Sequence, residues 1–72
     1  MSEPTTEQLL DFELAHEKPT GSKESQIIAD LDITPGRYYQ LLGRAARSEV
    51  GIAHNPIICR RIRDRRAART RL

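Results

Sequence analysis

Capping side chains followed by proline or glycine divide the 72-residue chain into short segments, and this spacing constrains the fold most. Thr34-Pro35 and Asn55-Pro56 each place a capping side chain before a proline, which is how many helices begin. Thr5 and Gln8 have the spacing of a capping box, and Lys18-Pro19-Thr20-Gly21 interrupts the helix before it. No segment alternates convincingly like a strand. The sequence therefore predicts an all-α fold with three to four short helices.

These signals also set the expected bounds. The first helix covers about residues 6–17, the second 23–31 with Ser22 as its cap, and the third about 35–48. The fourth begins at Pro56 and extends into an arginine-rich end. The apolar residues expected to face the core are Leu9, Leu10, Phe12, Leu14, Ile27, Ile28, Leu31, Tyr38, Leu41, Leu42, Ala45, Ile58 and Ile62. We expect one domain over 1–72, with a helical core over 5–55 and a basic C-terminal helix or tail over 56–72.

Residues 26–41 have the pattern of a helix-turn-helix. One short helix ends near Leu31, three residues turn the chain, and a capped helix begins at Pro35. The apolar residues expected to lock the two helices together are Ile28, Leu31, Ile33, Tyr38 and Leu41. Such turns often use glycine where this chain has Asp32, and aspartate tolerates the left-handed conformation better than most residues. An ordinary three-helix core with a solvated basic face is the alternative.

The third expected helix also separates into an apolar face and a basic face. Arginine can bond guanine through two donors, and glutamine can bond adenine. The residues expected to read bases in a major groove are Arg37, Tyr39, Gln40, Arg44 and Arg47. The small residues Thr34 and Gly36 at the start of this helix are expected to contact the DNA backbone.

The formal charge is unevenly distributed along the chain. Residues 1–32 carry eight acids and two lysines, a net charge of −6; residues 33–55 carry +2 and residues 56–72 carry +6. A basic end favours a polyanionic partner, and nucleic acid is the first candidate. The arginines of this end expected to contact phosphates are Arg60, Arg61, Arg63, Arg65, Arg66, Arg69 and Arg71. About six such contacts give log affinity against log salt a slope near −5.

Several short runs carry a resemblance to a known family. They are Leu10-Asp11-Phe12-Glu13, Gly21-x-Lys23-Glu24, Arg37-Tyr38-Tyr39-Gln40-x-Leu42, and Pro56 followed by an arginine-rich helix. Across residues 9–69 the chain resembles small proteins of mycobacteria, other actinobacteria and their phages, catalogued largely as a domain of unknown function. The resemblance implies a helix-turn-helix DNA-binding fold, and one mycobacterial relative is regarded as nucleoid-associated. This chain departs from the pattern at His16-Glu17, where relatives often carry an aromatic pair.

Catalysis and metal binding have little support. His16, His54 and Cys59 are scattered and make a poor zinc site, and the isolated glycines form no phosphate-binding loop. We therefore expect no enzyme activity, no metal and no cofactor. Arg60 and Arg61 are expected to lower the pKa of the Cys59 thiol, although a buried, idle thiol is the expected role of this residue. His16 is expected on the surface and His54 in a loop.

The overall expectation is a DNA-binding protein that acts as a transcriptional regulator or an architectural, nucleoid-associated protein. We expect a homodimer on double-stranded DNA in the cytoplasm, with no small-molecule substrate. No apolar run is long enough for a membrane span or signal peptide. The alternatives are a phage-encoded adaptor that binds an acidic host protein, and an RNA-binding module. The acidic first helix is expected to be the solvated side of an amphipathic helix; the alternatives are contact with a second subunit or RNA polymerase, and folding over the basic end when DNA is absent.

Overall fold

The computed structural model describes residues 3–18 and 20–70, and within them all regular secondary structure is helical. The helices are α1 (Thr6–Ala15), α2 (Gly21–Gln26), α3 (Pro35–Ala45), α4 (Glu49–His54) and α5 (Pro56–Thr70). One turn of π-helix, η1 (Ile27–Leu31), continues directly from α2. The predicted all-α class is confirmed, with one more short helix than the sequence indicated.

Three of the predicted helix starts are confirmed. In α1, Thr5 Oγ1 accepts a hydrogen bond from the Gln8 backbone, while Gln8 Oε1 accepts one from the Thr5 backbone, which completes the capping box. In α5, Asn55 Oδ1 accepts from the backbone N–H of Ile58 at 3.1 Å. Thr34 caps α3 in the same manner. These bonds satisfy N–H groups that have no partner inside the helix.

Other predicted boundaries are wrong. α2 begins at Gly21 because Thr20, not Ser22, accepts the hydrogen bond from the Lys23 backbone. α3 ends at Ala45 and not near residue 48, because the Ser48 hydroxyl accepts from the Gly51 backbone and so starts α4. α1 ends at Ala15, two residues earlier than predicted. At Ser48 a side chain that can cap a helix does so where a continued helix was expected.

Residues 32–34 join η1 to α3 in a tight turn. Asp32 has φ 56° and ψ 39°, the left-handed conformation expected for this position. It is the single non-glycine residue with positive φ among those described. A residue with this conformation lets the chain reverse within three residues, so that α3 leaves at once in a new direction.

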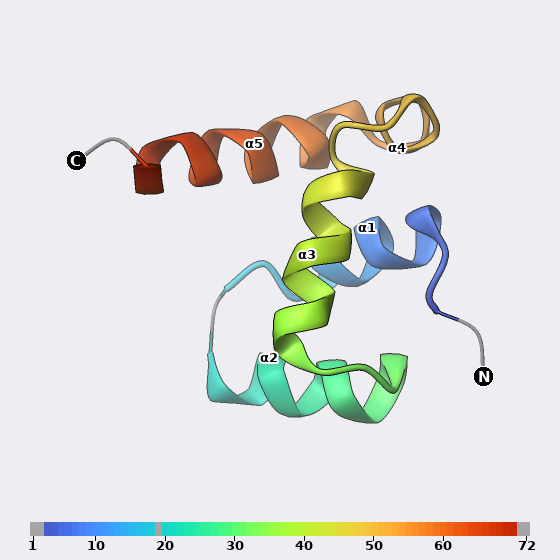
Figure 1. The fold of residues 1–72 in the computed structure, drawn as a ribbon, viewed down its shortest axis with the longest axis vertical. Helices are drawn as coiled ribbons and strands as arrows, with labels where there is room; N and C mark the ends of the chain where they lie inside the picture. Colours follow the sequence, from blue (N-terminus) through green and yellow to red (C-terminus); the bar gives the residue numbers. More distant parts are fainter. Residues whose placement is uncertain (1–2, 19, 71–72) are drawn as a thin grey trace.

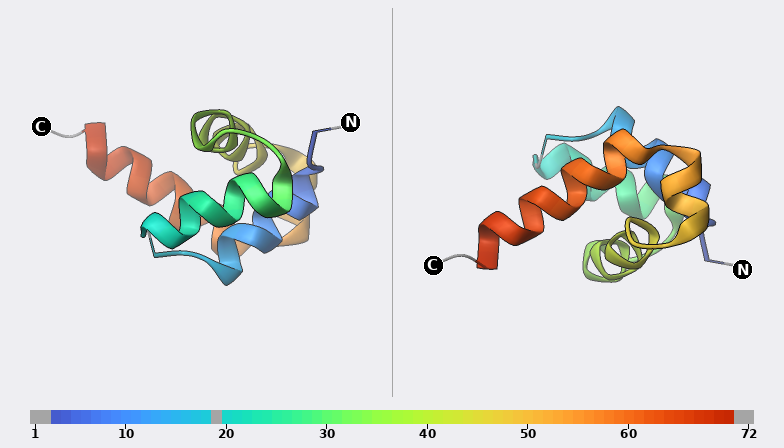
Figure 2. Two further views of the ribbon diagram at one scale, coloured as in Figure 1. Left: turned by 90° about the horizontal axis from the view of Figure 1, so that it is seen from below. Right: turned by 90° about the horizontal axis from the view of Figure 1, so that it is seen from above.

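The helices surround a core centred on α3 (Figures 1 and 2). α1 packs behind α3, α2 and η1 lie across its N-terminal end, and α5 lies across its C-terminal end and projects beyond it (Figure 1). Seen along α3, α5 spans both α3 and α1 (Figure 2, right). The buried core residues are Leu9, Leu10, Phe12, Ile27, Tyr38, Leu42, Ala45, Ala46, Ile58, Cys59 and Ile62.

Two residues predicted for the core are exposed instead. Leu14 is 51% exposed and Ile28 is 55% exposed. On α1 the adjacent Glu13 takes the inward position, and on η1 Ile27 does so. A π turn shifts the ordinary 3.6-residue spacing, so the apolar pattern of the second segment no longer predicts which side is buried. Leu31, Ile33 and Leu41 pack against the edge of the core and are partly buried.

Candidate nucleic-acid interface

The outer face of α3 and the turn that follows it carry arginines of two kinds. Arg44 and Arg47 are exposed, and neither guanidinium pairs with an acid among the described residues. Arg37 instead donates to Glu3 Oε2 from Nε at 2.8 Å and from Nη2 at 2.6 Å. Its Nη1 donates to Gln40 Oε1 at 3.1 Å. The expected base-reading stripe therefore consists of two open arginines and an Arg37–Gln40 pair tied to the N-terminal segment.

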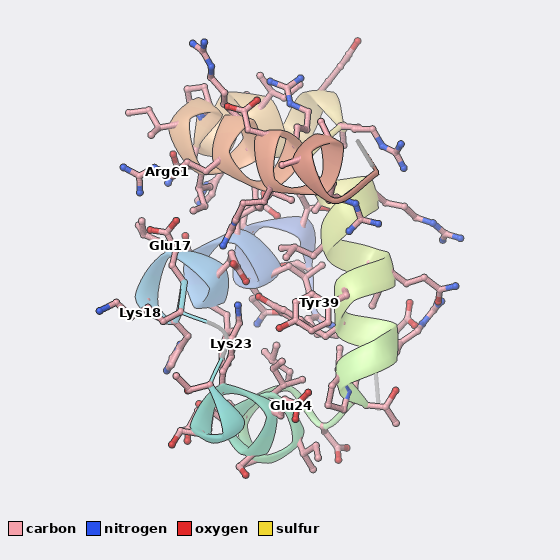
Figure 3. The ribbon with its side chains drawn as sticks, turned by 90° about the vertical axis from the view of Figure 1, so that its left-hand side faces the viewer. Glu17, Lys18, Lys23, Glu24, Tyr39 and Arg61 are labelled. Atoms are coloured by element: carbon pink, nitrogen blue, oxygen red, sulfur yellow. The ribbon has the colours of Figure 1, made fainter. Side chains whose placement is uncertain are left out.

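Tyr39 lies on a different side of α3 from this stripe. It is partly buried, its ring meets that of Tyr38 edge-on at 5.1 Å, and Lys23 Nζ lies 5.4 Å from its centroid. The side chain faces the space between α2, α3 and α5 (Figure 3). In this arrangement its contacts are to the protein itself, so it is not grouped with Arg44 and Arg47.

The N-terminal end of α3 is open to a close approach. The Thr34 hydroxyl caps the helix and accepts from the Arg37 backbone at 3.2 Å. Gly36 is exposed, and no atom lies within 4 Å of the place that a Cβ would occupy. The first turn of α3 therefore presents backbone N–H groups with little side-chain bulk around them.

The arginines of α5 lie along two edges, one facing α1 and one facing α3. On the α1-facing edge, Arg61 Nη1 donates to Glu17 Oε1 at 2.8 Å, and Arg65 Nη2 donates to Glu13 Oε2 at 2.9 Å. Figure 3 shows Arg61 above Glu17 on this side. The arginines of this edge therefore bind the carboxylates near the end of α1.

The α3-facing edge begins with Arg63 and Arg66. Arg66 Nη1 donates to the Tyr39 carbonyl at 3.2 Å, and its guanidinium lies over Gly43. A methyl group at position 43 would lie only 2.8 Å from Arg66 Cζ, so this glycine permits the contact. Arg63 is exposed and forms no ion pair with a described residue.

We assign the remaining arginines of the C-terminal run to neither of these two edges. Arg60 is 80% exposed and lies 3.9 Å from Asp64 one turn later on α5. The side chain of Arg69 and the whole of Arg71 lie outside the part of the chain that the structure describes. The seven arginines predicted to bind phosphate as one group are thus distributed over several environments.

A buried ionic cluster centred on Glu13 was not predicted from the sequence. Glu13 and Lys23 are 1% and 3% exposed, and Lys23 Nζ donates to Glu13 Oε1 at 2.8 Å. The Tyr38 hydroxyl donates to the same oxygen at 2.7 Å, and Arg65 supplies the other one with a donor. The cluster ties α1, α2, α3 and α5 together. Its signal in the sequence is that Glu13 follows Leu9 and Leu10 by four and three residues and so shares their face.

The expectation of a fully solvated acidic helix is therefore wrong for Glu13, and Glu17 also pairs with the basic end. Burial raises the pKa of the Tyr38 hydroxyl far above its ordinary value, and its hydrogen bond to Glu13 raises it further. A carboxylate with three donors is well stabilised at this depth, because each buried lone pair left without a donor costs free energy.

The cysteine and the histidines have structural contacts. Cys59 is buried, and burial raises its thiol pKa although Arg63 acts in the opposite direction, so the predicted lowering is wrong.

His16 stacks on Phe12 with ring centroids 4.2 Å apart. His54 lies in the last turn of α4, not in a loop, with Nε2 2.8 Å from Asp11 Oδ1. The described residues contain no group of three His, Cys, Asp or Glu side chains that could hold a metal ion.

A cleft of about 520 Å³ opens between α1, α2, α3 and α5 (Figure 3). Its walls include Glu13, Glu17, Glu24, Lys23, Arg65 and Arg66. Acidic and basic groups alternate around this opening, so it has no single charge preference. Arg44 on the outer face of α3 and Arg63 on the α3-facing edge of α5 lie outside this cleft and form no ion pair with a described residue.

Comparison with known proteins identifies the family of the chain. No helix in the described part of the chain has the length and apolar character needed to cross a membrane. No curated protein and no solved structure matches the sequence. One family model, described as a protein of unknown function (DUF3263), matches residues 3–72, almost the entire chain. The chain belongs to the DUF3263 family.

Proposed function

We propose that this protein binds double-stranded DNA, without catalysis, through the outer face of α3 and the adjoining edge of α5. The observation that carries the proposal is the pair Arg44, in the last turn of α3, and Arg47, in the turn that follows the helix; both are exposed, and neither has an acidic partner among the described residues. Arg66 of α5 adds a third guanidinium over the neighbouring Gly43. Grouped arginines on one face favour a polyanion, because their mutual repulsion is relieved when phosphates approach.

The local geometry supports a helix-turn-helix interpretation of residues 21–45. α2 with η1, a three-residue turn through left-handed Asp32, and the capped helix α3 follow one another in the required order. In this motif the second helix enters the major groove with its N-terminal part near base edges. α3 buries Tyr38, Leu42 and Ala45 on its inner side, which leaves Gln40 and Arg44 of the helix, with Arg47 in the turn after it, for the groove.

Arg37 belongs to the same proposed surface once its ion pair with Glu3 opens. The pair is partly exposed on both sides, at 39% and 52% of side-chain surface. Exposed ion pairs contribute about 0–1 kcal/mol, so a DNA phosphate or guanine can replace Glu3 as the partner. Thr34 and Gly36, at the open start of α3, are then in a position to approach a phosphate.

The proposed role is transcriptional regulation or DNA architecture in the cytoplasmic nucleoid, with a homodimer as the binding unit. One short recognition helix reads few base pairs, and two half-sites multiply the discrimination. A randomised duplex pool separates the two roles. Enrichment of a symmetric sequence supports regulation, and recovery of an unenriched pool supports architecture.

The test of DNA binding is fluorescence anisotropy with a random-sequence duplex between about 50 and 200 mM salt. Four to six phosphate contacts predict a slope of log affinity against log salt between about −4 and −5. Polyglutamate at equal charge serves as the competitor, and a duplex RNA of the same length serves as the second probe. No binding at the lowest salt would overturn the proposal. Equal competition by polyglutamate would favour the acidic-protein adaptor, and tighter binding of RNA would favour the RNA-binding module.

A further inference from the structure

We infer that the two edges of α5 have different partners: Arg63 and Arg66 contact the phosphate backbone of a DNA duplex, whereas Arg61 and Arg65 hold the fold together. The inference rests on the proposed DNA binding and assigns a division of labour within it. By sequence alone the basic end is one arginine-rich run. The inference assigns the arginines of that run to two different partners.

Helical geometry separates the two pairs. α5 buries Ile58 and Ile62, so its other side chains lie to either side of that buried line. Residues three or four apart share a face, which places Arg61 with Arg65 and Arg63 with Arg66. Seen from the C-terminal end of α5, α1 lies under one side of the helix and α3 under the other (Figure 3). The printed contacts agree, because Arg65 reaches Glu13 of α1 while Arg66 reaches Tyr39 of α3.

The α1-facing edge is occupied by the protein itself. Arg65 donates to Glu13 Oε2 at 2.9 Å, to the Glu17 carbonyl at 3.3 Å and to the Arg61 carbonyl at 3.4 Å. Glu13 is almost fully buried, so withdrawing Arg65 would leave a buried carboxylate with one donor fewer. If Arg65 turned to a DNA phosphate, the phosphate would have to replace all three of these hydrogen bonds, and Glu13 would lose the donor that Arg65 supplies. Displacement of Glu13 by a DNA phosphate as the partner of Arg65 is therefore unfavourable at this edge.

The α3-facing edge continues the open surface of α3. Arg66 lies over Gly43, which precedes Arg44 in the chain and lies one turn before Arg47. Arg63 is exposed one turn before Arg66 on the same side of α5. In this proposal Arg44, Arg47, Arg63 and Arg66 line one basic seam that runs from the end of α3 to the α3-facing edge of α5. A seam of guanidinium groups across two rigid helices suits the repeated phosphates of a duplex backbone.

The experiment compares two double variants that remove the same two charges from the same helix. Arg63→Gln with Arg66→Gln is predicted to flatten the salt slope by about 2 and to weaken random-duplex binding about 30-fold near 0.15 M salt. Its thermal midpoint falls by less than that of the Arg61 and Arg65 double variant, because the bond from Arg66 to the Tyr39 carbonyl is exposed, whereas Arg65 bonds the buried Glu13. Arg61→Gln with Arg65→Gln is predicted to keep the parent slope and to lose less than about threefold in affinity. Its thermal midpoint falls by about 5–15 °C.

Binding is measured at a temperature where circular dichroism shows both variants folded. If the double variant unfolds, the single variants Arg61→Gln and Arg63→Gln, each of which removes one exposed charge from one edge of α5, provide a matched comparison. Equal flattening of the slope by both double variants would overturn the division of α5 while leaving DNA binding intact. A larger loss from the Arg61 and Arg65 pair would overturn it as well. Absence of duplex binding by the parent protein would instead overturn the proposed function.

Discussion

α1 and α3 both carry charged side chains beside an apolar face, but the two helices differ in whether those charges are buried and paired or exposed. On α1, Glu13 points inward and accepts hydrogen bonds from Lys23, Tyr38 and Arg65. On α3, Arg44 lies outside, away from the buried Tyr38. The acids of α1 are used to join helices, whereas the arginines of α3 remain at the surface.

This difference shows why the net charge of a segment is a poor guide to the charge available to a partner. The run over 56–72 has a net charge of +6. Two of its arginines are paired with Glu13 of α1 and with Glu17 just beyond the end of α1, so the potential outside that edge is weaker than the sum implies. Among the described residues no such pairing reduces the charge of Arg44, on α3, or of Arg47, in the turn after it. The packing of each helix decides which charges act at long range.

The largest predicted effect is on the cluster itself. Glu13→Gln removes the charge that compensates the buried Lys23, and breaking one partner of a buried pair costs about 3–5 kcal/mol. A 72-residue domain has roughly 4–11 kcal/mol of total stability, so we expect the variant to be largely or wholly unfolded at physiological temperature. Urea unfolding followed by circular dichroism measures the change.

Glu7→Gln is the matched control, because Glu7 is an exposed carboxylate on the same helix. Its unfolding midpoint should remain close to that of the parent protein. If Glu13→Gln destabilised the protein no more than this control, the buried cluster would not be what joins α1 to its neighbours.

Tyr38→Phe tests the hydroxyl that reaches Glu13. Loss of this buried hydrogen bond is predicted to cost about 1–3 kcal/mol at neutral pH. The pKa of Tyr38 is raised in the folded state above its ordinary value of 10.0, so the folded state holds the proton more tightly. This stabilisation is complete below about pH 10 and is lost as the pH rises further.

The parent protein should therefore lose stability above about pH 10 more steeply than Tyr38→Phe. Cys59, whose buried thiol also has a raised pKa, is retained in both proteins, so its contribution cancels in the comparison. Unfolding midpoints from pH 7 to about 11 give the result. Parallel curves for the two proteins would show that Tyr38 is not held as a protonated donor.

Arg44→Ala addresses the other region, the open face of α3. We expect binding of a preferred duplex to weaken by about 1–3 kcal/mol and of a random duplex by about fivefold, with stability unchanged. Lys18→Ala is the control, because it removes one exposed positive charge at the end of α1, away from α3 (Figure 3). Similar losses from both variants would mean that net charge, not the face of α3, determines affinity.

Arg61→Ala has the smallest predicted effect. Arg61 and Glu17 are both partly exposed, and such pairs contribute about 0–1 kcal/mol, less when salt screens them. Urea unfolding is measured at low salt and at about 1 M salt. The difference between the unfolding midpoints of the variant and the parent should be smaller at the higher salt concentration. A loss as large as that of Glu13→Gln would place Arg61 within the buried cluster, contrary to the distances.

The parts of the fold that depend on local chemistry could be predicted from the sequence. The caps at Thr5, Thr34 and Asn55 are recognisable because each satisfies a backbone donor close by in the chain. Asp32 is recognisable because few residues adopt positive φ. Ile58 and Ile62 follow helical spacing on a polar helix, so their burial is predictable too.

The remaining features depend on competition between nearby alternatives. Ser48 fits either the interior of a longer α3 or the cap of α4, and only the packing of α4 against its neighbours decides between them. Glu13 and Leu14 compete for the inward position on α1, and donors from three other helices favour the carboxylate. Contacts between residues 10 to 52 positions apart in the chain leave little trace in a local pattern.

The most direct test of the central claim is an NMR titration of arginine side-chain Nε–H resonances with a short random-sequence duplex. The predicted result is that the resonances of Arg44, Arg47 and Arg63 shift progressively with added duplex. The resonance of Arg65 should hold its position, because the buried Glu13 retains it, and the resonance of Arg61, which pairs with Glu17 at the surface, should shift less than that of Arg44. Shifts of Arg61 and Arg65 equal to or larger than those of Arg44 would contradict the separation of structural from partner-binding arginines.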